Sequence, residues 1–250
     1  MYLLSWKHSL AIAFAAITLA LAAPVATTRA DLITNGDFES NGGDGQIDYN
    51  TSATGWYIDP GASSSYTFLY TSASSAMAGA NGQYGSLSLW GPDNGSNNGF
   101  TGSPTGGAFI AQDSAYQNAA LQQTITGLTI GAQYTVSFDW AAAQQYGFDG
   151  DNSSAWQVSL GSETYTTSSA TIPSHGFSGW MHETFTYTAT ASTEVLSFYA
   201  TGGPPVPPFA LLDGVSMSAN ITVPEPSMML GSLVLFSLFG SAWGYKRLKS

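Results

Sequence analysis

The stretch QYTVSFDW, residues 133–140, indicates the fold class. Its apolar residues alternate with polar ones, which is the pattern of a β-strand with one buried and one solvated face. The buried face would consist of Tyr134, Val136, Phe138 and Trp140. Four later stretches also have strand character, the first two alternating and the last two more continuously apolar: 155–160, 183–188, 195–199 and 210–217. Short strands of this kind predict an all-β protein.

The sequence between these strands favours turns over helices. Residues 31–222 are rich in Ser, Thr, Gly, Asn and aromatic residues, and no amphipathic helical period interrupts the strands. We therefore expect one antiparallel β-sandwich of jelly-roll type over 31–222. The longest loop is expected at 93–107, either flexible or held by a ligand, and 63–82 is a candidate insertion.

The charge distribution excludes several classes of function. All 16 Asp and Glu residues except Glu225 lie within 31–222, whereas none of the 5 Lys and Arg residues lies between 30 and 245. Such a domain repels the phosphates of DNA and RNA, which excludes nucleic-acid binding, and it favours neutral over anionic glycans unless calcium bridges the charges. The chain has no Cys, which excludes disulfides, a thiolate nucleophile and Cys-bound metals.

The N-terminus has the organisation of a secretory signal peptide. Lys7 precedes the apolar run from Leu10 to Ala23, and small residues follow up to Ala30. A retained membrane anchor is the alternative, but a helix of about 14 residues is only about 21 Å long, short of a hydrocarbon core of roughly 30 Å. We expect residues 1–30 to be removed after export by cleavage after Ala30. Cleavage after Ala26 is the alternative.

The C-terminus has the organisation of a membrane span. A proline-containing run at 223–227, Val-Pro-Glu-Pro-Ser, precedes the uncharged residues 228–245, and a basic tail follows at 246–250. As a helix the span is about 27 Å long, and the basic residues place its C-terminal end in the cytoplasm with the acidic domain outside. A buried core helix is the alternative, which the terminal position and the basic tail disfavour.

The same C-terminal residues resemble a known sorting signal. Val223, Pro224, Glu225 and Pro226, followed by the span and the basic tail, are similar to the PEP-CTERM signal of Gram-negative bacteria. This resemblance covers 223–250. It implies that an exosortase processes the protein and that the protein reaches the cell surface or extracellular matrix, where proteins with such tails accompany exopolysaccharide production. Removal of the span and its retention as an anchor both stay open.

The domain resembles the galactose-binding-like jelly rolls of carbohydrate-binding modules. The resemblance rests on short segments, which are LITNGDFE at 32–39, Gly55-Trp56, the region 127–139 and LLDGV at 211–215. It implies a non-catalytic domain that binds polysaccharide. In such domains a calcium ion often joins the N-terminal segment to the last strand, and Glu39 and Asp213 stand at the matching positions.

This calcium site has an alternative and several weaker candidate ligands. Asp213 could instead cap a turn while Glu39 is solvated. The weaker candidates are Asp37, Asp44 and Asp48. The run DGDNS at 149–153 has the carboxylate spacing that opens an EF-hand loop, but it lacks the turn glycine and the final glutamate, so we interpret it as an acidic turn.

Exposed aromatic residues beside amides are what a glycan site requires, because sugar rings stack on aromatic faces while amides and carboxylates bind the hydroxyls. Trp90, Tyr116 and Tyr146 fit this description. Trp140 and Trp156 are in phase with other apolar residues and are predicted to be buried.

The sequence gives little support to catalysis. The expected domain has two histidines, His175 and His182, and no Gly-x-Ser-x-Gly turn or zinc-ligand spacing accompanies them. We therefore expect a binding module without enzymatic activity. A structural matrix or adhesion protein without a small ligand is one alternative, and a polysaccharide-degrading enzyme that uses two of the carboxylates is another.

Overall fold

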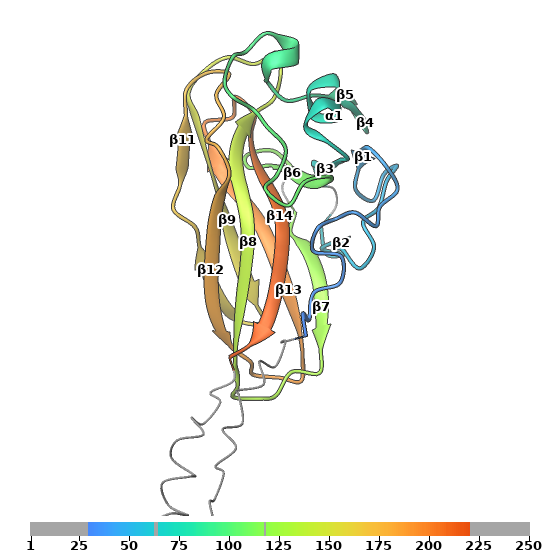
Figure 1. Cartoon of the computed structure of the whole chain (residues 1–250), viewed down its shortest axis with the longest axis vertical. Coiled ribbons are helices and arrows are strands. Elements are labelled where there is room, and N and C mark those ends of the chain that lie inside the picture. The colour runs from blue at the N-terminus through green and yellow to red at the C-terminus, as the bar shows by residue number, and fades with distance from the viewer. Residues whose placement is uncertain (1–29, 63–64, 118, 221–250) are drawn as a thin grey trace, which may run out of the picture. The chain divides into compact units, whose positions relative to one another are not determined.

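The computed structural model describes residues 30–62, 65–117 and 119–220. Two large antiparallel β-sheets form the body of this domain (Figure 1). The first sheet has the strand order β1 (Gly45–Gln46), β3 (Thr67–Tyr70), β6 (Phe109–Asp113), β14 (Pro208–Ala219), β8 (Gln133–Gln144) and β12 (Met181–Thr188). The second has the order β10 (Glu163–Thr166), β9 (Asn152–Leu160), β13 (Thr193–Gly203), β7 (Leu121–Thr126) and β2 (Tyr57–Ile58), and β11 (Ala170–Ile172) also pairs with β9.

The chain passes from one sheet to the other between its long strands. β6, β8, β12 and β14 belong to the first sheet, and β7, β9 and β13 belong to the second. This alternation produces the predicted antiparallel jelly-roll sandwich, which is confirmed. The five stretches with strand character form β8, β9, β12, β13 and β14.

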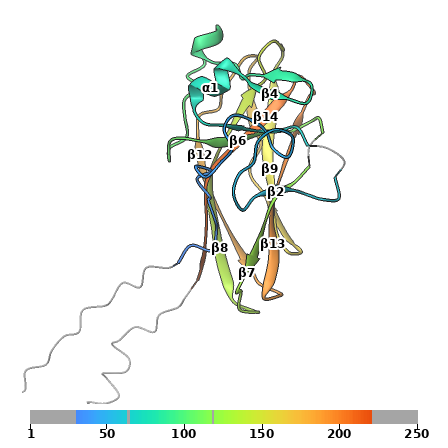
Figure 2. The ribbon, with the colours of Figure 1, turned by 90° about the vertical axis from the view of Figure 1, so that its right-hand side faces the viewer.

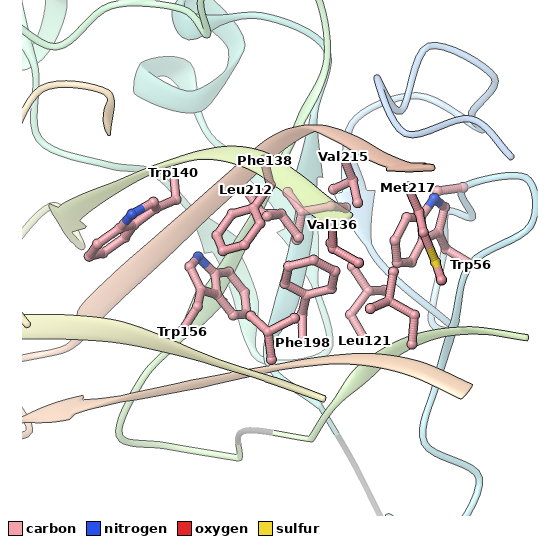
Figure 3. Close-up of a cluster of buried hydrophobic side chains, with 14 of the residues drawn as sticks. Trp56, Leu121, Val136, Phe138, Trp140, Trp156, Phe198, Leu212, Val215 and Met217 are labelled. Carbon is pink, nitrogen blue, oxygen red and sulfur yellow. The ribbon is translucent and has the colours of Figure 1, made fainter. Parts of the chain in front are cut away.

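A core of aromatic and aliphatic side chains fills the space between the sheets (Figure 3). Phe198 of the second sheet contacts Phe138 of the first, with ring centroids 5.2 Å apart, and it also contacts Trp56 and Trp156. The indole N–H of Trp156 donates to the carbonyl of Leu211 at 3.0 Å, which joins β9 to β14 across the core. Trp140 and Trp156 are fully buried, as their phase in the sequence predicts.

A second apolar cluster covers the outer face of the first sheet. The elements that pack onto this face are α1 (Ala73–Ala78), the hairpin of β4 (Ala80–Gly82) and β5 (Gly85–Leu87), and the segment after η1 (Pro92–Asn94). Figure 2 shows α1 and β4 at the end of the sandwich away from the turn that joins β7 to β8. The buried side chains of this cluster include Phe68, Tyr70, Met77, Leu87, Phe100, Phe109, Phe209 and Leu211. β6 and the first half of β14 are therefore buried on both faces, which explains the consecutive apolar residues at 109–111 and 209–212.

The loop at 93–107 is held by the chain itself. The Asn98 amide donates to the carbonyls of Trp90 and His175, and the Ser96 hydroxyl donates to the same His175 carbonyl. Phe100 is buried in the second cluster. The glycine-rich composition thus permits irregular backbone, and hydrogen bonds with one buried ring fix it in place.

Both ends of the described domain lie at one end of the sandwich. The Leu32 N–H donates to the Met217 carbonyl, and the Asn220 N–H donates to the carbonyl of Gln133, the first residue of β8. The predicted signal peptide, sorting motif and membrane span fall outside the described residues, apart from Ala30 itself. Within residues 30–62, 65–117 and 119–220, no helix combines the length and hydropathy that crossing a bilayer requires.

Removal of the Phe198 ring should strongly destabilise the fold. We expect Phe198→Ala to lower the free energy of unfolding of the full-length protein by about 3–5 kcal/mol, because a cavity would open among three aromatic rings. Phe198→Leu keeps more volume and should cost less. Urea unfolding followed by tryptophan fluorescence measures both values. Ile130→Ala, at a side chain that is 68% exposed, is the control and should cost less than about 0.5 kcal/mol. A cost below about 1 kcal/mol for Phe198→Ala would contradict this view of the core.

Candidate functional site

An open groove lies where several loops meet at one end of the sandwich. Its volume is about 320 Å³, and we call it the aromatic groove. Its lining residues are Tyr66, Tyr84, Asp113, Ala115, Tyr116, Gln145, Phe148, Pro205 and Pro207. They come from the residue before β3, the β4–β5 turn, the last residue of β6 and the connections that follow β6, β8 and β13.

The strand register brings these connections together. β14 lies between β6 and β8, so its first residues pair with the last residues of both neighbours. Beyond the paired strands, the Ser114 N–H donates to the Pro208 carbonyl at 2.8 Å, and the Gln145 N–H donates to the Pro207 carbonyl at 3.2 Å. Three connections far apart in the sequence therefore form one rim.

Aromatic rings dominate the lining of the groove. The ring centroid of Tyr66 lies 5.9 Å from that of Tyr116 and 6.1 Å from that of Tyr84. Tyr66 is buried, whereas Tyr84, Tyr116 and Phe148 are 58%, 50% and 43% exposed. The Gln117 amide donates to the Tyr84 hydroxyl at 3.1 Å and so links two walls of the groove. Exposed ring faces around a concavity are a typical binding surface.

Asp113 is the charged residue of the lining. Its side chain is almost completely buried, and one carboxylate oxygen, Oδ1, accepts the N–H groups of Ala115 and Tyr116 at 2.8 and 3.0 Å. Burial raises the pKa of Asp113 to about 6, against the opposing effect of the two N–H donors. The same carboxylate adds to the effect of burial in raising the pKa of the Tyr66 hydroxyl.

The structure separates the three aromatic residues predicted to contact a glycan. Tyr116 lines the groove, whereas Trp90 and Tyr146 lie beside it. The Trp90 ring stacks on His175 at 3.9 Å and contacts Tyr146 at 4.4 Å, and its indole N–H donates to the Phe148 carbonyl at 3.1 Å. Trp90 therefore supports the loop that carries Phe148 into the groove.

Of the nine lining residues, the sequence identified only Tyr116 as a glycan contact. The missed residues with aromatic or charged side chains are Tyr66, Tyr84, Asp113 and Phe148. Tyr84 carried a signal, because it follows Asn81-Gly82-Gln83 in turn-forming text and a large side chain at a turn is usually exposed. Phe148 stands in the loop with Tyr146 and carried a similar signal. Tyr66 and Asp113 carried none, since their place in the groove depends on the pairing of β3 with β6.

The two predicted calcium ligands contact one and the same loop. Glu39 Oε1 accepts the Ala108 N–H at 2.6 Å, and Asp213 accepts a hydrogen bond from the Thr105 hydroxyl. Gly107, at a φ of +70°, allows the Glu39 carboxylate to approach, because any side chain there would clash with it.

Asp213 has a buried carboxylate oxygen, Oδ1, without a hydrogen-bond partner. Burial is the main cause, and the neighbouring Asp37 carboxylate a minor one, of a rise in the pKa of Asp213 to about 6. An unpaired buried oxygen fits a cation. The described part of the chain contains no group of three or more His, Asp or Glu side chains placed to hold a metal, so most ligands of such an ion would be backbone carbonyls, hydroxyls or water.

The weaker calcium candidates have other partners. Asp44 accepts the N–H and hydroxyl of Thr71, and Asp48 accepts the Ile58 N–H. In the acidic turn, Asp149 pairs with His175 at 2.6 Å and Asp151 accepts the Ser174 N–H. These contacts agree with a turn at 149–151, whereas residues 152 and 153 of the predicted turn already belong to β9.

Each of the two histidines of the domain is paired with an aspartate. His182 Nδ1 lies 2.9 Å from Asp139 Oδ1, and the pair sits on β12 and β8 away from the groove. Among residues 30–62, 65–117 and 119–220, no Ser or Thr hydroxyl hydrogen-bonds to either imidazole ring. The described structure therefore shows no hydroxyl nucleophile next to a histidine base.

No family model and no curated protein matches the sequence. Among solved structures, the chain is similar to the carbohydrate-binding module TmCBM61 in complex with β-1,4-galactotriose, at 13% identity and a TM-score of 0.42, over 76% of this chain and 99% of that one. It is also similar to the CBM22-1 xylan-binding domain of Paenibacillus barcinonensis Xyn10C, at 9% identity and a TM-score of 0.39, over 80% of this chain and 100% of that one. A third similar structure is the enzymatically active domain of tailspike protein 4 of bacteriophage CBA120, at 12% identity and a TM-score of 0.37, over 76% of this chain and 21% of that one. These similarities concern the arrangement of strands.

Ionisation of Asp113 should make the stability of the protein depend on pH. The unfolded chain releases this proton near the ordinary pKa of 3.8, whereas the folded protein holds it up to about pH 6. The cost of ionising the buried carboxyl thus lowers the free energy of unfolding. This cost is absent below pH 3.8, grows up to about pH 6 and is constant above that value. Asp113→Asn removes the cost, and its amide oxygen can still accept both N–H groups.

We therefore expect Asp113→Asn to gain stability relative to the wild type as the pH rises from about 4 to about 7, by an amount on the order of 3 kcal/mol. Urea unfolding of both full-length proteins across this range measures the difference. Two parallel stability curves would show that the carboxyl does not titrate abnormally.

Proposed function

We propose that the domain binds a carbohydrate in the aromatic groove and acts as a non-catalytic module of an exported surface protein. The observation that carries this proposal is the convergence of exposed Tyr84, Tyr116 and Phe148 around one concavity. Flat aromatic faces suit the apolar C–H faces of sugar rings. Gln145 and Asp113 supply the polar groups that sugar hydroxyls need.

The terminal sequences support a location for this function. We infer that the signal peptide exports the protein, that the 228–245 span holds it in the membrane before processing and that an exosortase acts at Val223, Pro224, Glu225 and Pro226. The domain would then meet exopolysaccharide at the cell surface or in the extracellular matrix. Cell fractionation of a variant with Pro224→Ala and Pro226→Ala tests this inference, because we expect surface delivery to fail; unchanged delivery would contradict it.

Calcium is the proposed structural ion of the domain. Glu39 and Asp213 would hold it against the 105–108 loop, and the ion would balance the buried Asp213 carboxylate. Its role would be to fasten the N-terminal segment to β14, at a distance from the groove.

Loss of either aromatic wall should weaken glycan binding. We expect Tyr84→Ala and Tyr116→Ala each to raise the dissociation constant for a bound polysaccharide about tenfold, which is about 1.4 kcal/mol. Calorimetry and affinity electrophoresis of the full-length protein in a mild detergent, against a panel of neutral and acidic polysaccharides, measure this effect. Tyr165→Ala removes an exposed tyrosine from β10 on the other sheet and is the matched control. A wild type that binds none of the panel would overturn the proposed function and favour a purely structural role.

Calcium should raise the melting temperature of the wild type. An ion present at about 100 times its dissociation constant adds about 2.7 kcal/mol to the free energy of unfolding. For a domain of this size, this raises the melting temperature by roughly 5–10 °C. Thermal unfolding with calcium and then with chelator measures the shift. Glu39→Gln should lose it, whereas Glu163→Gln, on β10, should keep it. If the wild type melts at one temperature in both conditions, the calcium proposal fails.

A further inference from the structure

The aromatic groove contains a buried negative charge that no cation of the domain can balance. Asp113 is 1% exposed, and its Oδ1 oxygen accepts two neutral backbone N–H groups, which carry no full positive charge. No Lys or Arg lies between residues 30 and 245, and the two histidines, His175 and His182, are paired with other aspartates. A carboxylate withdrawn from water without a positively charged partner is costly, so the groove favours any ligand that brings a positive charge.

The rings around Asp113 favour the same kind of ligand. The ring centroid of Tyr66 lies 5.9 Å from that of Tyr116 and 6.1 Å from that of Tyr84, and Phe148 adds a fourth ring to the lining. The face of an aromatic ring is electrostatically negative and attracts ammonium groups. A carboxylate within such a set of rings is therefore a site for an organic cation.

The lining also excludes other classes of charged ligand. Calcium and magnesium require six or more oxygen ligands, whereas this lining offers one carboxylate, one amide and tyrosine hydroxyls among apolar surfaces. Anionic sugars would meet Asp113 with no cation to offset the repulsion. A cation that tolerates apolar contact, such as a protonated amine, suits both the rings and the carboxylate.

We propose that the aromatic groove selects glycans that carry protonated amino groups, with the ammonium placed beside Asp113 and the sugar ring against Tyr84 and Tyr116. This inference rests on the proposed function of the same groove and specifies its ligand as an amino sugar. A small quaternary amine also carries a positive charge that can lie against aromatic rings, so it is the other candidate ligand of this kind. A comparison of choline with the glucosamine oligomer distinguishes the two ligands.

Three β-1,4-linked oligosaccharides of equal length isolate the effect of the charge. They consist of glucose, N-acetylglucosamine or glucosamine, and they differ only in the group at carbon 2, which is hydroxyl, acetamide or ammonium. In calorimetry with the full-length protein in mild detergent, we expect the glucosamine oligomer to bind at least about tenfold more tightly than the glucose oligomer. The advantage should shrink as salt is added.

Substitution of the carboxylate tests the assignment to Asp113. Asp113→Asn should abolish the advantage of the glucosamine oligomer, so that the variant binds the glucosamine and glucose oligomers with affinities within about twofold of each other. Asp93→Asn changes the net charge equally at an exposed side chain outside the groove and should keep the advantage. Preserved folding of Asp113→Asn is checked by its melting temperature.

The outcomes distinguish this inference from the proposed function. Equal binding of the three oligomers, or an advantage that survives Asp113→Asn, overturns the amino-sugar inference and leaves glycan binding in place. Binding of none of the oligomers, or of any polysaccharide, overturns both. The last comparison uses choline and its uncharged carbon analogue, 3,3-dimethylbutanol. If choline binds in an Asp113-dependent manner and the glucosamine oligomer does not bind, the groove is assigned to quaternary amines and the amino-sugar inference is overturned.

Discussion

The contact of Phe198 and Trp156 with the opposite sheet is the interaction on which the other features depend. Phe198 packs against Phe138, and Trp156 donates a hydrogen bond to the Leu211 carbonyl, so the second sheet fixes the position of β14. β14 in turn lies between β6 and β8, and its first residues pair with the last residues of both. The rim of the aromatic groove is therefore set by packing in the centre of the domain.

The second apolar cluster determines where a ligand can bind. Residues 71–107 cover the outer face of the first sheet in the region of β3, β6 and the first half of β14. A polysaccharide cannot lie on that part of the sheet, because its side chains are already buried. The exposed aromatic rings are instead found at the margin of the covering layer, where the loops that follow β6, β8 and β13 meet the β4–β5 turn.

The long strands could be predicted because their burial leaves a local trace. In β8 each buried side chain from Tyr134 to Trp140 alternates with a less buried residue, and this period is visible in a single segment. The short strands β1, β2, β4 and β5 have only two or three residues each, too few to show a period. The layer that covers the second apolar cluster also escaped prediction, since α1, β4, β5 and the segment after η1 come from a stretch rich in Ser, Ala, Gly and Asn that has no clear period.

The groove could be predicted only in part for a related reason. Tyr116 is exposed beside amides, and the sequence alone identifies it as a candidate. Trp90 has the same appearance in the sequence, but its ring lies against His175 behind the Phe148 loop. Asp113 looks like a residue at the end of a strand, and its unbalanced charge becomes visible only when four separate segments are assembled around it.

The position of the two chain ends has a mechanical consequence. Pro208 at the start of β14 adjoins the groove, and Ala219 at its end adjoins both termini of the described domain, roughly 36 Å further along the strand. If a polysaccharide in the groove is pulled while the chain is held by its C-terminus, the tension runs along β14. The hydrogen bonds that join β14 to β8 then share the load in shear and cannot open one after another from an end. The geometry of the last strand thus suits a domain that resists force between a tether and a bound polymer.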